Sequence, residues 1–457
     1  MIMHIKKYNI VFFILTLFSF FLYLFAPNKY DHQWCYVCFG LFLISFLLLL
    51  KVKKKENYFD FENIFLFSCL FVYFVYPCFV YPLNPKMFFM FDFPFNHDVI
   101  TKGTSLALLG LQSFILGSVW KGSYKKTKDS LKQDTLKIFD TKKITFALSL
   151  FFVLFFAVSY DFFLRKVYRG GLEGNTVYVY LIYQSLLTIA LVLEFRNLYI
   201  AKIQGIDYKI NKLVLFFTIF TIVAYLYSGY RSAAIYIILI LGICYSSFYK
   251  PIKLKLFLIS VFVGALLMTF IALSRSSSIE ENNDFRGDSI ILGATMDLII
   301  NARTLYVCVD YVQNNDILYG KTMIVTFFSF VPFSQRILFG LNILDISEAS
   351  SGTFFTTLDF GKHSTFGVGS NIIADIFLSF GMIGVIFFMF ALGRIQVVFY
   401  NFRFKNNIKW FFCYAVIMGN VLYMSRGEYF FSMKNIFWVN FIFILMYNIQ
   451  NQYKRIK

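Results

Sequence analysis

The sequence predicts an all-α integral membrane protein with about 12 transmembrane helices and one large extracytoplasmic loop. The first observation is composition: 59% of the 457 residues are hydrophobic, and 63 phenylalanines stand against 25 acidic residues. A soluble domain cannot bury so much apolar surface, so the bilayer must be the solvent. The second observation is the recurrence of long apolar runs, and the third is the concentration of lysine and arginine in alternating loops.

The apolar runs define the expected spans in chain order. The length and apolar composition of each run predict a membrane-spanning helix. They lie at residues 9–26, 35–50, 61–82, 104–120, 144–163, 175–195, 213–228, 232–248, 254–274, 371–393, 409–424 and 435–450. The first run resembles a signal peptide but lacks a small-x-small cleavage site, so we expect it to be retained as a span.

The basic loops orient these spans. KVKKK (51–55), the segment 121–143 and YKPIKLK (249–255) each follow an even-numbered span. Because cytoplasmic loops are enriched in lysine and arginine, we expect these loops inside the cell, together with both termini. The same enrichment accounts for the net charge of +18 without nucleic acid as a partner.

The longest outer segment is 275–370, between the ninth and tenth spans. Long loops without linker composition are usually functional. This one contains amphipathic stretches at 289–312 and 323–341, which we expect to lie on the membrane surface or to cap the helices. We therefore expect one polytopic membrane domain over residues 1–457, with 275–370 as its large loop.

Arginines on the predicted outer side suggest a binding site for a polyanion. Arg231 follows a Ser-Gly-Tyr turn that ends in Tyr230 and opens the eighth span. A cation at a helix N-terminus is unfavourable unless an anion joins it, and the two together suit a phosphate group. Arg426, Arg275 and Arg303 lie on the same predicted side. The alternative is that each arginine contacts lipid headgroups only.

Fewer side chains on the predicted outer side could act as a general base. His363 lies in LDFGKHSTFGVGSN directly before the tenth span, Asp375 lies in its first turn, and Glu428 follows Arg426. Asp310 is a further option, and each of the four could instead be structural. The seven cysteines lie mostly in apolar runs, and no cluster of metal ligands occurs, so we expect neither a metal nor a cofactor.

Residues 364–393, STFGVGSNIIADIFLSFGMIGVIFFMFALG, resemble the segment after the large loop in the O-antigen polymerase (Wzy) family. The Ser-Gly-Tyr-Arg turn at 228–231 and Ser-Arg-Gly-Glu at 425–428 resemble that family too. The resemblance implies a membrane glycosyltransferase of the type C kind in the bacterial inner membrane. It would join undecaprenyl-pyrophosphate-linked oligosaccharide units at the periplasmic face, in O-antigen and lipopolysaccharide biosynthesis.

The resemblance also implies partners and roles. Membrane lipid and a chain-length regulator protein are the expected partners besides the lipid-linked oligosaccharide. With that donor, Arg231, Arg426, Arg275, Arg303 and Tyr230 would bind the pyrophosphate. His363, Glu428 or Asp375 would take the proton from the acceptor hydroxyl.

Two alternatives use similar architecture. An O-antigen ligase uses the same donor but transfers the glycan to the lipid A core. A flippase or another transporter also fits the number of spans, although transporters usually carry ionisable residues near the middle of the membrane. The predicted spans hold almost none away from their ends. The sequence therefore favours the polymerase over the ligase, and the ligase over a transporter.

Overall fold

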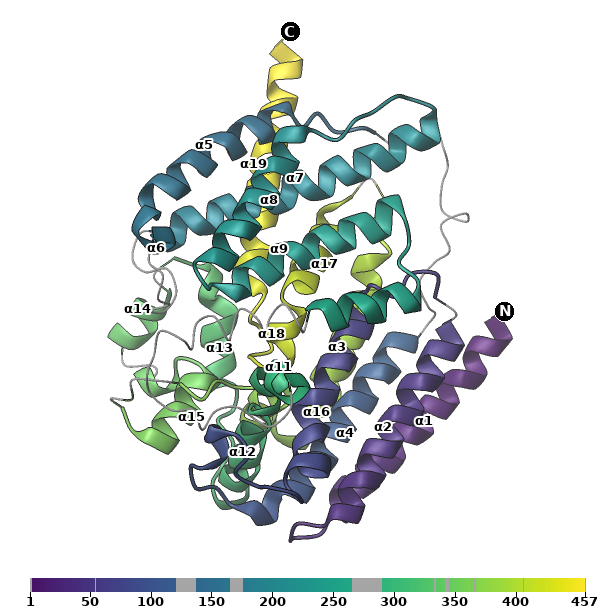
Figure 1. Ribbon diagram of the computed structural model, residues 1–457, viewed down its shortest axis with the longest axis vertical. Helices are drawn as coiled ribbons and strands as arrows, with labels where there is room; N and C mark the ends of the chain where they lie inside the picture. The colour runs from purple at the N-terminus through teal and green to yellow at the C-terminus, as the bar shows by residue number, and fades with distance from the viewer. Residues whose placement is uncertain are drawn as a thin grey trace.

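The computed structural model describes residues 2–53, 55–120, 137–164, 176–264, 290–332, 334–341, 345–362, 364, 367–405 and 407–456. Helices and turns make up this part of the chain, and no strand occurs in it. The expectation of an all-α protein is confirmed. Figure 1 shows α1 and α2 at the lower right of the molecule and α5, α7, α8 and α9 in its upper half. Helices α12 to α15 lie toward the lower left, with α11 near the middle.

The first group of helices surrounds α4, which is buried along nearly its whole length. The group comprises α1 (Ile2–Leu24), α2 (His32–Lys53), α3 (Phe61–Leu70) continued by the π-helix η1 (Phe71–Val80), α4 (Ile100–Val119) and the later α16 (Ile372–Tyr400). The short helices η2 (Phe89–Phe91) and η3 (His97–Val99) precede α4.

Small residues let α4 and α16 approach closely. A Cβ added at Gly117 would lie 2.0 Å from the carbonyl oxygen of Phe390, and one at Gly393 would lie 2.1 Å from that of Phe114. Neither position can hold a side chain without moving a backbone. Such glycine contacts are typical of helix pairs in membranes, where packing replaces the hydrophobic driving force between helices.

The second group packs around α7 and α9. It comprises α5 (Lys142–Val158), α6 (Tyr160–Leu164), α7 (Thr176–Gln204), α8 (Lys212–Tyr227), α9 (Arg231–Cys244) with η6 (Tyr245–Tyr249), α17 (Lys409–Gly419), α18 (Val421–Ser425) and α19 (Met433–Ile456). The cores of α7, α9 and α17 are continuous with that of the first group.

The described residues of the predicted large loop are also helical. They form α11 (Ile290–Ile299), α12 (Ala302–Asn314), α13 (Lys321–Phe327), η8 (Phe328–Phe330), α14 (Ser334–Gly340), η9 (Ile346–Glu348) and α15 (Ser351–Phe360). The stretch expected at 289–312 is split into α11 and α12. The first half of α12 is buried, and the ring of Tyr306 packs directly against Gly103 of α4.

Within the part of the chain that the structure describes, six helices are long and apolar enough to cross a membrane. They are His32–Lys53, Phe61–Val80, His97–Val119, Thr176–Gln204, Arg231–Tyr249 and Ile372–Tyr400. Other expected spans correspond to shorter apolar helices, such as α8 and α17. The count of about 12 spans therefore stays a prediction, as does the single large loop.

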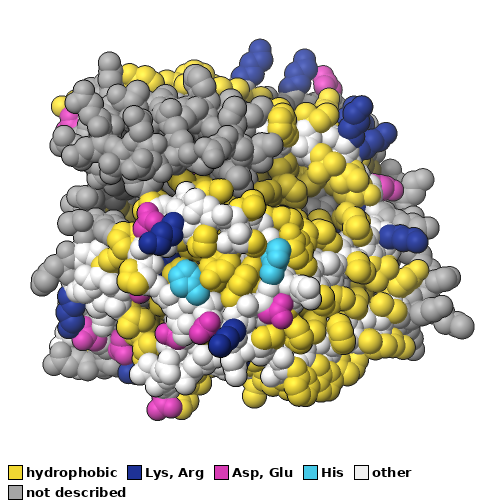
Figure 2. All heavy atoms as spheres, turned by 60° about the horizontal axis from the view of Figure 1, so that its bottom comes forward, with side chains coloured by type: hydrophobic (Ala, Val, Ile, Leu, Met, Phe, Trp, Pro, Cys, Tyr) yellow, Lys and Arg dark blue, Asp and Glu magenta, His cyan; other side chains and the backbone are white. Residues whose placement is uncertain are grey.

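The surface pattern agrees with a membrane protein. Large hydrophobic side chains are exposed on the outside of both groups, among them Phe13 and Leu47 in the first and Phe146 in the second. Figure 2 shows one end of the molecule with acidic, basic and histidine side chains gathered among polar atoms, whereas hydrophobic side chains cover much of the adjoining flank. A flank of this kind suits lipid, and a polar end suits water.

Candidate functional site

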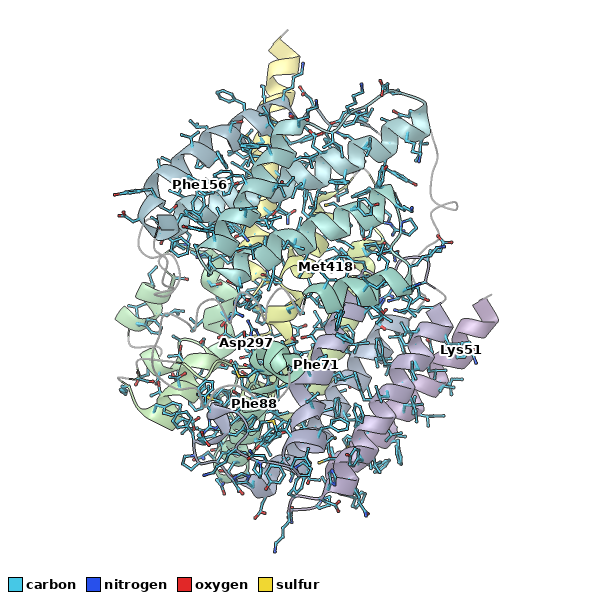
Figure 3. All side chains as sticks on the ribbon, in the orientation of Figure 1. Lys51, Phe71, Phe88, Phe156, Asp297 and Met418 are labelled. Carbon is cyan, nitrogen blue, oxygen red and sulfur yellow. The ribbon has the colours of Figure 1, made fainter. Side chains whose placement is uncertain are left out.

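The candidate site is a polar cluster where the N-terminus of α9, the end of α11 and the turn after α18 meet. Figure 3 labels Asp297 of α11 in the middle of the molecule, beside this junction. Three segments far apart in the sequence contribute, since Arg231 opens α9, Asp297 lies in α11 and Arg426 follows α18.

Arg231 is paired with an acidic residue. The chain turns through Gly229, whose φ of +73° lies in the left-handed region, and Tyr230 then packs against Tyr225. Nη2 of Arg231 donates to Oδ2 of Asp297 at 3.3 Å. The carboxylate thus supplies the anion that a cation at a helix N-terminus needs.

Arg426 converges on the same residue through the main chain. Its Nη1 donates to the carbonyl oxygen of Asp297 at 3.1 Å, and its guanidinium lies 4.7 Å from the ring centroid of Tyr423. Asp297 therefore contacts both arginines, one through its carboxylate and one through its backbone. Asp297 is not among the site residues predicted from the sequence; the signal that could have indicated it is a lone carboxylate in an otherwise apolar helix.

Two asparagines hold this arrangement against α16. Nδ2 of Asn301 donates to the Asp297 carbonyl oxygen at 2.7 Å, and Nδ2 of Asn371 donates to the Asn301 carbonyl oxygen at 3.0 Å. Asn371 also caps α16, because its Oδ1 accepts from the backbone N–H of Ala374 at 2.9 Å. The arginine cluster is thereby fixed to the segment 364–393, on which the family resemblance depends.

The predicted carboxylates lie next to each other. Asp375 is buried in the first turn of α16, and its Oδ2 accepts from the backbone N–H of Tyr429 at 2.9 Å. Glu428 directly precedes that residue, and its charge interacts unfavourably with that of Asp375. Burial raises the pKa of the Glu428 carboxyl, while hydrogen bonds from Ser350, Gly352 and Thr326 oppose this.

One turn connects the two halves of the site. Within Arg426-Gly427-Glu428-Tyr429, the arginine faces Asp297 and the glutamate and its successor face Asp375. The cationic cluster and the carboxylate pair are therefore close neighbours. A ligand whose anionic group lies on Arg231 and Arg426 would place its adjoining part near two potential bases.

Arg303 is engaged elsewhere. Its guanidinium is buried, forms an ion pair with Asp359, donates to the carbonyl oxygen of Pro94 at 3.1 Å and lies 5.7 Å from the ring centroid of Phe95. These contacts tie α12 to α15 and to the segment before α4. Asp310, the further option for a base, accepts from Nδ2 of Asn96 at 2.7 Å at the surface.

Two predicted site residues, His363 and Arg275, lie outside the residues that the structure describes. Within the described residues, no three histidine, cysteine, aspartate or glutamate side chains come together as metal ligands. All seven cysteines are buried thiols.

The fold and the site define a multi-pass helical membrane protein with an arginine cluster suited to an anionic group, beside a pair of carboxylates. The chain matches the family model of the O-antigen polysaccharide polymerase Wzy over residues 8–450 and belongs to that family. The predicted family is confirmed, and with it a glycosyltransferase-type polymerase of polysaccharide biosynthesis that acts on a lipid-linked oligosaccharide. No curated protein and no solved structure showed a match.

Proposed function

We propose that this protein polymerises undecaprenyl-pyrophosphate-linked repeat units at the periplasmic face of the inner membrane, with Arg231 and Arg426 on the donor pyrophosphate. The observation that carries the proposal is the convergence of these two arginines, which belong to separate hairpins, on Asp297. Arginine remains charged at an interface and can bind phosphate with two donors at once.

The transfer step uses the two halves of the site together. The acceptor hydroxyl oxygen attacks C1 of the donor sugar, and the C1–O bond to the pyrophosphate breaks. The lipid pyrophosphate leaves with the electron pair, and its growing charge is stabilised by the arginines. The hydroxyl proton passes to a carboxylate, for which Glu428 and Asp375 are the described candidates and His363 a third.

Glu428 is our first choice for the base. Its pKa is raised by burial, and a carboxylate with a raised pKa is a stronger base than an exposed one. It also lies two residues from Arg426, so a donor held there would bring its C1 close by. Asp375 then positions the turn by accepting from Tyr429.

Tyr230 and Arg303 take supporting parts in this proposal. Tyr230 packs the turn before Arg231, and Arg303 fixes the start of α12 two residues after Asn301. Arg275 is proposed as a further pyrophosphate ligand from its place in the sequence.

The decisive experiment is deletion of the gene in its host, followed by gel analysis of lipopolysaccharide. A polymerase deletion should leave single repeat units on the lipid A core, and the wild-type gene should restore long chains. Lipopolysaccharide without any repeat unit would instead indicate a ligase or a flippase and would contradict the proposal.

A further inference from the structure

We propose that Asp297 is a positioning residue whose carboxylate competes with the bound pyrophosphate for Arg231 and so promotes release of the pyrophosphate product. This inference rests on the proposed function of the two arginines. It adds a residue that neither the sequence pattern nor the family match points to, and it concerns the end of the reaction cycle.

The contact between Asp297 and Arg231 is loose. Its N–O distance of 3.3 Å exceeds the usual length of a charge-assisted hydrogen bond, about 2.7–2.9 Å. The side chains are 45% and 24% exposed, respectively. A partly exposed ion pair at this long distance is weak, so a pyrophosphate with several charges can replace the carboxylate on Arg231.

Two further hydrogen bonds from described residues reach the backbone of Asp297. Its carbonyl oxygen accepts from Arg426 and from Asn301, at 3.1 and 2.7 Å. These bonds lie at the C-terminal end of α11, where carbonyl groups lack helical partners. The carboxylate can therefore leave Arg231 without disturbing Arg426 or the end of the helix, and its charge can be removed by substitution while the framework stays.

Product release is the step at which a competing carboxylate matters most. When the C1–O bond breaks, the phosphate that was linked to the sugar becomes a terminal phosphate with one more ionisable oxygen, so the product is more negative than the donor. Two arginines alone would hold the product more tightly than the donor. A carboxylate that returns to Arg231 and repels the product offsets this difference.

The test uses the purified full-length protein and inorganic pyrophosphate as the probe. Asp297→Asn removes the charge and keeps the shape, so pyrophosphate binding should tighten about two- to fivefold, as expected for an exposed pair. Asp316→Asn is the matched control, because Asp316 is exposed in the same outer region and contacts neither arginine. Its affinity for pyrophosphate should equal that of the wild type.

The polymerisation assay gives a second readout. In Asp297→Asn, kcat and the KM for donor should both fall, and added pyrophosphate should inhibit at a correspondingly lower concentration. Asp297→Glu, which restores the charge, should restore the wild-type inhibition. A merely structural role would lower kcat without strengthening inhibition by pyrophosphate.

Several outcomes would overturn the inference: unchanged or weaker pyrophosphate binding in Asp297→Asn, or equal tightening in Asp316→Asn. If Asp297→Asn does not yield folded protein, Asp297→Ser serves for the same comparison. Failure of the proposed function gives a different result, because the wild type would then bind no pyrophosphate, or Arg231→Ala would bind it equally well.

Discussion

Arg231 lies at the N-terminus of α9, and the carboxylate of Asp297 provides the anion that a cation in this place needs. The Ser-Gly-Tyr turn and the following apolar run place Arg231 at a helix N-terminus, and α9 indeed begins there. The need for an anion followed from elementary electrostatics. The identity of that anion did not, because Asp297 is 66 residues away along the chain and no local pattern relates the two.

The first prediction concerns the guanidinium of Arg231. Arg231→Lys should lose nearly as much polymerisation as Arg231→Ala, because lysine keeps the charge but lacks the two-donor fork. Loss of a contact that strengthens in the transition state costs about 2.7–4 kcal/mol, or about a hundredfold or more in rate. The measurement is chain-length distribution and transfer rate in membranes with equal protein levels.

Arg394→Lys is the matched control. Arg394 donates to the carbonyl oxygen of Trp120 from the later half of α16 and has no part in the site. Its lysine variant should polymerise normally. Wild-type polymer from Arg231→Ala would refute the pyrophosphate role and would leave an arginine that contacts lipid headgroups only.

The second prediction concerns the pH dependence of Glu428. Burial raises its pKa, so as a base it loses its charge on acidification at a higher pH than an ordinary glutamate, whose pKa is about 4.3. The transfer rate should therefore fall on the acid side earlier than an exposed carboxylate would allow. Glu428→Gln should lower the rate by about 10²–10⁴-fold, and the fall in rate on the acid side of the pH profile (the acid limb) should disappear.

Asp310→Asn provides the comparison for Glu428, since it removes a surface carboxylate that binds Asn96. Its pH profile should match that of the wild type. Retention of the acid limb in a still active Glu428→Gln protein would transfer the role of base to another group.

At the scale of helices, the presence of a helix was easier to predict than the neighbours against which it packs. Apolar runs located the helices, because a membrane helix must satisfy its backbone internally and expose apolar side chains. The fate of 289–312 was harder to predict. An amphipathic stretch suits a membrane surface and a protein surface equally well, and α12 buries its first half against α16, α4 and η1. Only the complementary surface, formed by distant residues, decides between them.

The third prediction concerns the contact between α4 and α16. Gly117→Ala should push the helices apart, because the new Cβ would lie 2.0 Å from the Phe390 carbonyl oxygen. Overpacking of this kind costs about 1–3 kcal/mol. We expect a lower thermal midpoint in detergent and less folded protein. Gly40→Ala on α2 is the control, since no heavy atom lies within 4 Å of its added Cβ, and it should leave the midpoint unchanged.

At the scale of the whole molecule, contacts relate segments that the charge pattern had assigned to the same side. The backbone N–H of Tyr58, near the inner segment 51–55, donates to the carbonyl oxygen of Ile252 in the inner segment 249–255, at 2.8 Å. Beside them, Lys53 and Lys55 form buried ion pairs with Glu62. Arg231, Asp297 and Arg426, all assigned to the outer side, also meet. The charge pattern could assign sides but not distances, because it counts residues and carries no information on which loops touch.

The last prediction tests this topology directly. Reporter fusions at Lys250 and Asn314 should lie in opposite compartments, because one expected span, 254–274, separates them, and the reporter at Lys250 should be cytoplasmic. A fusion at Ser228 should share the compartment of Asn314, since Arg231 and Asp297 are in contact. Should the reporters at Ser228 and Asn314 instead prove cytoplasmic, the donor pyrophosphate could not reach the arginines from the periplasm. The site would then have to work on the cytoplasmic side, where a nucleotide-activated donor is available and a lipid-linked one is not required.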